Sequence, residues 1–175
     1  GNSYSYADAK TNVEIHKYGS HIFHTSDHQV WSFVTQFAEF NNYRHQIIAN
    51  VAGELYEFPI NINTIRKVFD ADEIPDLVEV DTPMNFQQAA LKSVGKTLYE
   101  MFYKGYTEKH WGVEAHEVPA STFTRIPVRN DTSRDYFNDI HVGVPIDGYG
   151  SLFKRMLDHE NILVITNTTY GSTKL

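Results

Sequence analysis

The chain of 175 residues contains no cysteine and no long apolar run. Without cysteine it cannot form a disulfide framework, a thiolate metal site or a cysteine nucleophile. No stretch approaches the roughly 18 to 20 apolar residues that span a bilayer, and the segment GNSYSYADAK lacks the apolar core of a signal peptide. The sequence therefore predicts a cytoplasmic protein with no membrane partner, whose chemistry uses other side chains or a bound cofactor.

Positive charge is also scarce, with 15 Lys and Arg against 22 Asp and Glu and a formal net charge of −7. Surfaces that bind nucleic acid gather Lys and Arg because these side chains neutralise phosphates. The acidic balance therefore argues against a nucleic-acid partner and indicates a solvated surface that keeps the protein soluble. Any phosphate-containing ligand has to be held by a few local arginines.

Apolar periodicity in the first two thirds of the chain predicts helices around one hairpin. Ser26 and Gln29 have the spacing of a capping box, and apolar residues at helical intervals then predict a helix over residues 26–40. Two β-prone runs around the turn Val51–Glu54 predict a hairpin that closes near Pro59. Further helices are expected from a cap at Asn63 to Phe69, from a cap at Asn85 to Gly95, and over residues 98–106.

From Pro119 onward, short apolar runs are interrupted by Pro, Gly, Asn and Asp, which is typical of strands and loops. The exception is a helical periodicity over residues 149–157, which leads into the strand-like run ILVIT at 162–166. The sequence thus predicts an α+β fold, with a small helical bundle within residues 26–118 and part of a mixed or antiparallel β-sheet within residues 119–175.

Two histidines follow a glycine in the segment IHKYGSHIFHT, residues 15–25. His21 and His24 are spaced by three, but a third ligand at a recognised spacing is missing, as are an HExxH motif and a cysteine pair. A metal site is therefore a poor interpretation, and we expect no metal. From these residues alone, hydrogen-bonded structural histidines remain the simpler alternative.

The segment KGYTEKHWG, residues 104–112, places Tyr106, Thr107 and Trp111 near the end of a predicted helix. Aromatic residues at such a position can be part of the core. They can also stack on a planar base, an interaction that suits the face of uracil. Both interpretations stay open at the level of the motif.

The segment TRIPVRNDTSRDYFND, residues 124–139, offers three arginines, followed by Tyr136. The planar fork of an arginine matches the oxygens of a phosphate, although a run of charges is often only a solvated surface. Neither interpretation can be preferred from this segment alone. The three arginines are Arg125, Arg129 and Arg134.

The same three segments carry a resemblance to a known family. The chain contains, in order, YGSHIFHT, VWSFVTQFAEFNNYRH, LYEFPININT, KSVG, KGYTEKHWG, VPASTFTRIPVR, DYFND and GVPIDGYGSLFKRML. Over essentially the whole chain, these motifs resemble those of prokaryotic UDP-galactopyranose mutases in order and spacing. The family's G-x-G-x-x-G fingerprint for the FAD pyrophosphate and its C-terminal third are absent from this sequence. We therefore expect a central fragment of a three-domain, FAD-dependent mutase.

The resemblance implies a division of the chain and an activity for the complete protein. Residues 1–25 would form the edge of the FAD-binding domain, residues 26–118 a helical substrate-binding domain, and residues 119–175 a partial β-sheet domain with a mobile loop. The complete protein would be a homodimer that interconverts UDP-galactopyranose and UDP-galactofuranose for cell-surface polysaccharide biosynthesis. The isolated fragment is expected to be inactive and not to bind FAD by itself.

The resemblance also implies roles for individual residues. Reduced flavin supplies the nucleophile, so the protein positions and shields the reaction. His21 and Gly19 are expected to contact the flavin ring, and His21 and Arg125 are the expected catalytic residues. Tyr106 is expected to stack on uracil, and Arg125 to swing in on its loop and hold the diphosphate of UDP or UDP-galactose. The expected substrate contacts are Phe102, Tyr106, Thr107, Trp111, Arg125 and Tyr136, with Arg129 and His45 as second-rank candidates.

Departures from the family pattern leave local details open. His110 stands where the family usually has glutamine, and Asp147 and Gly150 replace a glycine and a threonine. Three other interpretations are a non-catalytic module that binds nucleotide sugars, another FAD enzyme of the amine-oxidase type, and a structural helical domain. The first would not need His21, and the second would not supply KGYTEKHWG together with RIPVR.

Overall fold

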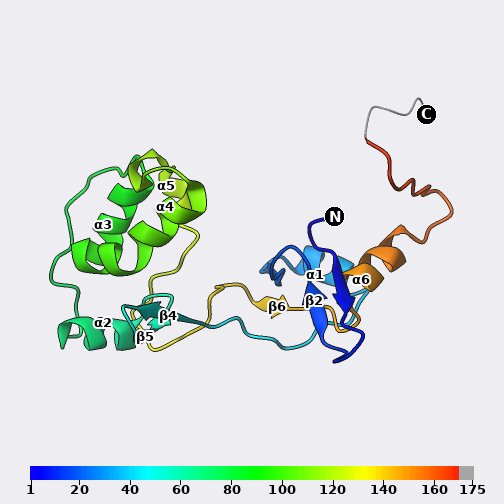
Figure 1. Ribbon diagram of the computed structural model, residues 1–175, viewed down its shortest axis with the longest axis horizontal. Coiled ribbons are helices and arrows are strands. Elements are labelled where there is room, and N and C mark those ends of the chain that lie inside the picture. Colours follow the sequence, from blue (N-terminus) through cyan, green and yellow to red (C-terminus); the bar gives the residue numbers. More distant parts are fainter. Residues whose placement is uncertain (170–175) are drawn as a thin grey trace. The chain divides into compact units, whose positions relative to one another are not determined.

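The computed structural model describes residues 1–169 and divides the chain into two compact units (Figure 1). Unit 1 comprises Gly1–Tyr43 together with the described residues from Asp139 onward, and unit 2 comprises Arg44–Asn138. Both units combine helices with two-stranded antiparallel sheets. The α+β class is therefore confirmed.

The limits of the two units differ from residues 25 and 118, at which the sequence analysis divided the chain. Unit 1 is discontinuous in sequence, because the segment that follows unit 2 returns to pair with the strand Phe23–Thr25. The assignment of residues 1–25, 26–118 and 119–175 to three domains of a longer flavoenzyme stays a prediction.

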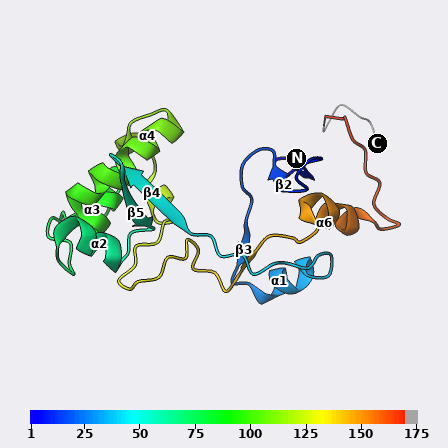
Figure 2. The same ribbon diagram turned by 60° about the horizontal axis from the view of Figure 1, so that its bottom comes forward.

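Unit 1 is built from short strands and two helices. Strand β1 (Ser5–Ala7) pairs with β2 (Glu14–His16), and β3 (Phe23–Thr25) pairs with β6 (His141–Gly143). Helix α1 (His28–Val34) follows β3, whereas α6 (Gly148–Leu157) follows β6 and packs against β1 (Figure 2). The buried cluster of this unit is small and consists of Ala38, Tyr149 and Leu152.

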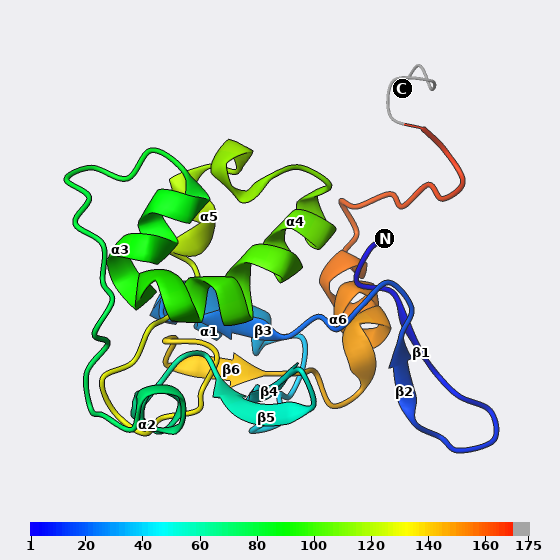
Figure 3. The same ribbon diagram turned by 60° about the vertical axis from the view of Figure 1, so that its left-hand side comes forward.

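Unit 2 contains a hairpin and most of the helices. Figure 3 shows α3, α4 and α5 grouped together, with α2 beside the hairpin on another side of the unit. The hairpin strands pair so that Ile47 lies opposite Phe58. The elements are β4 (Ile47–Val51), β5 (Glu54–Phe58), α2 (Ile62–Phe69), α3 (Phe86–Leu98), the π-helix η1 (Tyr99–Lys104), α4 (Gly105–Trp111), the 3-10 helix η2 (Ala115–Glu117) and α5 (Ala120–Phe123).

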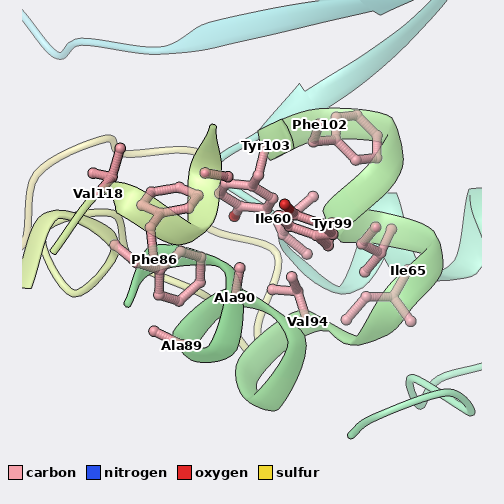
Figure 4. Close-up of a cluster of buried hydrophobic side chains, with 13 residues drawn as sticks. Ile60, Ile65, Phe86, Ala89, Ala90, Val94, Tyr99, Phe102, Tyr103 and Val118 are labelled. Carbon is pink, nitrogen blue, oxygen red and sulfur yellow. The ribbon is translucent and has the colours of Figure 1, made fainter. Parts of the chain in front are cut away.

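The core of unit 2 is rich in aromatic rings (Figure 4). Phe86, on the first turn of α3, meets Phe123 edge-to-face, with 5.5 Å between the ring centroids. Tyr103 from η1 approaches the same Phe123 ring at 5.3 Å. Such pairs add to the free energy gained by burying the rings. The full cluster is Ile60, Ile65, Phe86, Ala89, Ala90, Val94, Leu98, Tyr99, Phe102, Tyr103, Ala115, Val118 and Phe123.

Several elements lie where the sequence predicted them. The hairpin turns at the expected residues, and the side chain of Asn85 caps α3 by accepting a hydrogen bond from the Gln88 N–H at 2.9 Å. The predicted helix over 149–157 is α6. These signals are local, because one cap or one turn together with an apolar repeat is enough to fix each element.

Two predicted helix starts are wrong by one or two residues. Asp27, not Ser26, caps α1 by accepting hydrogen bonds from the N–H groups of Gln29 and Val30. The Ser26 hydroxyl instead donates to Asp139, 113 residues away, so it is not available as a cap. Helix α1 also ends at Val34, well before residue 40.

Helix α2 begins after Asn61, whose side chain accepts from the Thr64 N–H, whereas Asn63 donates to Glu57. Gly95 interrupts α3 with a positive φ of 72°, as a helix-ending glycine does, but helical structure resumes at Lys96 and continues into η1. The carboxylate of Asp76 accepts hydrogen bonds from the N–H and hydroxyl of Thr97, each at 2.7 Å. The long link between α2 and α3 is thereby fixed to this interruption.

The prediction that residues 119–175 supply the strands of a sheet is wrong in part. In the described portion of this segment, α5 and α6 are helices and β6 is the one strand. The run at 162–166 forms no strand, because no described strand pairs with it, and its residues are exposed. Within residues 1–169, the helices are too short or too polar to traverse a bilayer.

Candidate functional site

Unit 2 contains a cavity of about 490 Å³, within the roughly 300 to 1,000 Å³ range of small-molecule sites. Its wall combines the hairpin, the first residue of α3, η1, α4, α5 and the segment that leads to Tyr136. Most of the wall is apolar, and Glu100 is the one charged residue among the described lining residues. The lining comprises Ile47, Ala49, Asn50, Val51, Phe58, Phe86, Glu100, Met101, Phe102, Tyr103, Gly105, Tyr106, Thr107, Trp111, Thr122, Ile126 and Tyr136.

The π-helix explains how neighbouring residues of one helical segment reach different parts of the wall. Phe102 and Thr107 are buried, whereas Tyr106 is 70% exposed. An i→i+5 turn changes the phase of the helix between the buried face of η1 and the exposed face of α4. Such turns are frequent at functional sites because they redirect side chains without ending the helix.

The exposed aromatic residues lie at the end of α4. The Tyr106 ring is stacked on His110, with centroids 5.7 Å apart and an angle of 8° between the planes. Trp111 meets His110 edge-on at 6.2 Å and is itself half exposed. The core interpretation of KGYTEKHWG applies to Thr107, which is buried, but not to Tyr106 and Trp111, which are exposed. The stacking interpretation stays a prediction.

Tyr136 reaches the cavity from the segment that follows the predicted mobile loop. Its N–H donates to the His45 carbonyl at 2.9 Å, and its ring meets the rings of His45 and Phe58. Burial is the largest cause that raises the pKa of Tyr136, and nearby Tyr106 raises it further. The phenol therefore stays neutral near pH 7 and can donate a hydrogen bond. Burial also lowers the pKa of His45.

The three predicted arginines are used in different ways. Arg129 donates from Nε and Nη2 to the carbonyl of Asp135 and from Nη2 to that of Phe137, so it shapes the backbone before and after Tyr136. Arg134 pairs with Glu57, with 3.7 Å between Nε and Oε1.

Arg125 is different from the other two arginines. It is exposed and makes no hydrogen bond or ion pair with any other described residue. It is absent from the described lining of the cavity, but the next residue, Ile126, is part of that lining. A free cation therefore follows directly from the cavity wall along the chain.

The predicted flavin contacts lie in unit 1. Gly19 has a left-handed φ of 104°, and no atom lies within 4 Å of the position that a Cβ would take. The Gly19 carbonyl is 2.8 Å from Nδ1 of His21. Because a carbonyl only accepts, this contact places the proton of the neutral imidazole on Nδ1 and leaves Nε2 as an acceptor. The ring of Tyr149 lies edge-on to His21, with 6.4 Å between centroids.

His24 has a separate role from His21. Its Nδ1 lies 2.7 Å from Asp139, in the β3–β6 pair. The two histidines therefore do not converge on one ligand. Among the described residues, no group of three or more His, Asp or Glu side chains could hold a metal ion.

The hairpin and Tyr103 are among the parts of the cavity wall that were not predicted from the sequence. The hairpin contributes Ile47, Ala49 and Val51, which alternate along β4 and so share one face. This alternation was the available signal. Tyr103 was also missed, because a tyrosine beside a predicted core residue has no signal of its own in one sequence.

Comparison with known proteins agrees with the motifs. Residues 101–175 match the family model described as UDP-galactopyranose mutase. A probable UDP-galactopyranose mutase from Klebsiella pneumoniae is 41% identical over 174 residues, which cover 94% of this chain and 45% of that protein. A dTDP-fucopyranose mutase from Escherichia coli is 38% identical, over 93% of this chain and 46% of that protein.

A UDP-galactopyranose mutase from Mycoplasma pneumoniae is 29% identical, over 91% of this chain and 44% of that protein. The chain thus spans less than half the length of these curated relatives. Similarity to such proteins runs along nearly all of the chain, and residues 101–175 match the family model. The chain is thus similar, along nearly its whole length, to proteins of the UDP-galactopyranose mutase family.

Proposed function

We propose that this chain is part of a flavin-dependent isomerase that interconverts UDP-galactopyranose and UDP-galactofuranose. In this proposal, unit 2 binds the nucleotide and unit 1 contributes contacts to the flavin. One observation carries the proposal. Phe102, Tyr106, Thr107, Trp111 and Tyr136, which the family resemblance selects as substrate contacts, all line one cavity.

The composition of the cavity favours a planar base over a charged group. A diphosphate beside Glu100 in an apolar wall would be repelled and poorly solvated. A pyrimidine has apolar faces that suit aromatic rings, and its few polar atoms can bond with hydroxyl groups. We therefore assign the base to the cavity, with Tyr106 as the stacking residue.

The diphosphate is then assigned to Arg125. Arg129 and Arg134 are already engaged with backbone carbonyls and with Glu57, so their removal would also disturb the fold. Arg125 is free among the described residues, and its neighbour Ile126 belongs to the wall. A guanidinium in this position can pair with phosphate oxygens as soon as the base is bound. Tyr136 is the proposed second contact.

The residues of unit 1 fit one face of a flavin ring. Gly19 presents backbone without a side chain, and His21 has its ring fixed by the Gly19 carbonyl. These two residues would hold the isoalloxazine part of FAD and not its pyrophosphate. Reduced FAD, when bound, supplies the nucleophile for the ring interconversion. His21 and Gly19 orient the cofactor, while Arg125 and the cavity hold the substrate and limit the access of water.

A mutase that acts on a dTDP sugar is a second candidate. The relative from Escherichia coli that bears the name dTDP-fucopyranose mutase is 38% identical, close to the 41% of the Klebsiella protein. Uracil and thymine share the same ring carbonyls and differ by one methyl group. Parallel titrations with UDP and dTDP separate the candidates, because the preferred base gives the lower Kd.

The test of the nucleotide site uses the chain itself. UDP is titrated while tryptophan fluorescence is recorded, and the Trp111→Phe variant identifies the signal that comes from unit 2. Removal of a stacking ring weakens binding by about 1 to 3 kcal/mol, so Tyr106→Ala is expected to raise the Kd roughly 5-fold to 150-fold. The matched control is Tyr18→Ala, which removes an exposed tyrosine from unit 1. If the chain shows no saturable response to UDP or dTDP, the proposed nucleotide site is wrong.

The cofactor is tested separately. The chain is mixed with FAD, desalted and scanned for flavin absorbance, then assayed for turnover after reduction with dithionite. We expect neither stoichiometric FAD nor ring interconversion, because the sequence has no glycine-rich turn for the pyrophosphate. One flavin retained per chain would show that this account of the cofactor site is wrong.

A further inference from the structure

The hydroxyl of Tyr103 is a buried polar group that the fold leaves unused. Tyr103 is 2% exposed, and its hydroxyl oxygen has no hydrogen-bond partner among the described residues. Figure 4 shows its ring among the core side chains Phe86, Ile60 and Phe102. Such a hydroxyl loses its bonds to water on folding and gains none in return.

Buried hydroxyls in native proteins normally have a partner, so an exception points to a bound molecule. Tyr103 lines the cavity, as do Tyr136 and Tyr106. A ligand in the cavity is therefore in a position to offer the missing acceptor. The aromatic neighbours of Tyr103 in the core, Phe58, Phe86 and Phe123, have no acceptor in their side chains.

The protonation state of Tyr103 makes it a donor. Burial raises the pKa of its phenol, and nearby Tyr136 raises it further. The proton is thus retained throughout the neutral pH range. A neutral phenol in an apolar wall is best satisfied by a carbonyl oxygen, which costs less to desolvate than a charged acceptor does.

We propose that the Tyr103 hydroxyl donates a hydrogen bond to a ring carbonyl of the pyrimidine base in this cavity, which makes Tyr103 a substrate-binding and base-positioning residue. This inference rests on the proposed function and adds a polar contact to a site otherwise defined by stacking. The bond fixes the base within its plane, because stacking alone allows a base to slide and rotate. The same hydroxyl serves uracil and thymine, since both carry ring carbonyls.

The test compares Tyr103→Phe with Tyr99→Phe by calorimetric titration with UDP and by thermal unfolding of the free chain. Tyr99 is on the same π-helix and is 1% exposed, but it is not part of the described lining of the cavity. Loss of one neutral hydrogen bond is expected to raise the Kd for UDP roughly 3-fold to 10-fold in Tyr103→Phe. Tyr99→Phe is expected to leave the Kd unchanged within a factor of two.

Thermal unfolding of the free chain provides the second readout. Removing an unsatisfied hydroxyl relieves its desolvation, so the Tm of free Tyr103→Phe is expected to equal or exceed that of the parent chain. A lower Tm together with an unchanged Kd would show a partner inside the protein and overturn the inference. An unchanged Kd with an equal or higher Tm would assign the hydroxyl to an ordered water and overturn the inference as well. If the parent chain itself binds no UDP, the proposed function fails together with this inference.

Discussion

The two units differ in how completely they hold their own candidate sites. Unit 2 has a thirteen-residue apolar cluster that contributes to the wall of its cavity. The cluster contains five buried aromatic rings, those of Phe86, Tyr99, Phe102, Tyr103 and Phe123. Unit 1 has only Ala38, Tyr149 and Leu152 in its buried cluster and leaves large side chains such as Phe33 half exposed. The proposed base site is thus carried by a packed unit, whereas the predicted flavin contacts Gly19 and His21 lie in the loop between β2 and β3.

This difference in packing is tested most directly by removing a central ring from unit 2. Phe86→Ala deletes a side chain that is 1% exposed and also lines the cavity, so the free energy of unfolding is expected to fall by about 3 to 5 kcal/mol. Phe33→Ala, in unit 1, is expected to cost less than about 1 kcal/mol, because half of that ring is already in water. Urea denaturation followed by far-UV circular dichroism measures both. Equal losses would show that Phe33 is packed as tightly as Phe86 and that the two units do not differ in this respect.

The second prediction concerns the charge beyond the cavity. Arg125→Ala, made in a complete protein that contains this chain, removes the proposed charged partner of the diphosphate, and loss of such a partner typically costs about 2 to 4 kcal/mol of transition-state binding. The value of kcat/KM with UDP-galactofuranose is therefore expected to fall roughly 30-fold to 1,000-fold.

The control for Arg125 is Lys154→Ala, which removes an exposed cation from α6 of unit 1. Its kcat/KM is expected to stay within twofold of the parent value. A change of less than threefold in Arg125→Ala would remove this arginine from the site and leave Tyr136 as the proposed phosphate contact.

The third prediction separates backbone conformation from packing within unit 2. Gly95 and Gly53 both have left-handed φ values, of 72° and 93°. A Cβ at Gly95 would meet the carboxylate of Asp76 and lie 2.9 Å from its carbonyl oxygen, whereas a Cβ at Gly53 would meet open space. Gly53→Ala is expected to cost about 1 to 2 kcal/mol, from the left-handed conformation alone.

Gly95→Ala is expected to lower the free energy of unfolding by at least about 1 kcal/mol more than Gly53→Ala does. The reason is that the hydrogen bonds from Thr97 to the Asp76 carboxylate have to shift as well. Thermal unfolding of the two variants measures the difference. If both lose the same stability, the contact with Asp76 does not restrain the link between α2 and α3.

The sequence predicted those elements whose signals are local. The hairpin and the Asn85 cap depend on residues within one or two turns of each other. The errors at Ser26 and Asn63 have a common cause, since each side chain bonds elsewhere, Ser26 with Asp139 and Asn63 with Glu57. Whether a polar residue caps a helix is thus decided by partners that the local pattern does not contain.

The candidate site shows the same difference between residues grouped by a local motif and residues whose partners are distant. The segment KGYTEKHWG already grouped Tyr106, Thr107 and Trp111. The three arginines could not be separated by sequence, because the carbonyls that bind Arg129 become available only when the backbone around Tyr136 has folded. The functional roles assigned to these residues stay predictions until the variants are measured.

The last prediction tests how unit 1 compensates for its small core. His24 and Asp139 join the two sequence segments of this unit through a hydrogen bond of 2.7 Å between Nδ1 and Oδ2, to which Ser26 adds a second bond. The bond from His24 is the largest cause that lowers the pKa of Asp139 below its usual 3.8, with Ser26 contributing less. A carboxyl with a lowered folded-state pKa stabilises the fold above its unfolded pKa, and this contribution is lost as the pH falls through the folded value.

Asp139→Asn is therefore expected to lower the free energy of unfolding by about 1 kcal/mol at pH 7, with the difference from the parent shrinking between pH 5 and pH 3. Trp31 reports on this region, because it stacks on His141 of β6 with 4.5 Å between ring centroids. Urea titrations at several pH values, followed by Trp31 fluorescence in a Trp111→Phe background, measure the effect. Ser26→Ala keeps the carboxylate and is expected to preserve the pH dependence. A loss in Asp139→Asn that is equal at pH 7 and pH 3 would assign it to side-chain packing, and unit 1 would then not depend on this carboxylate.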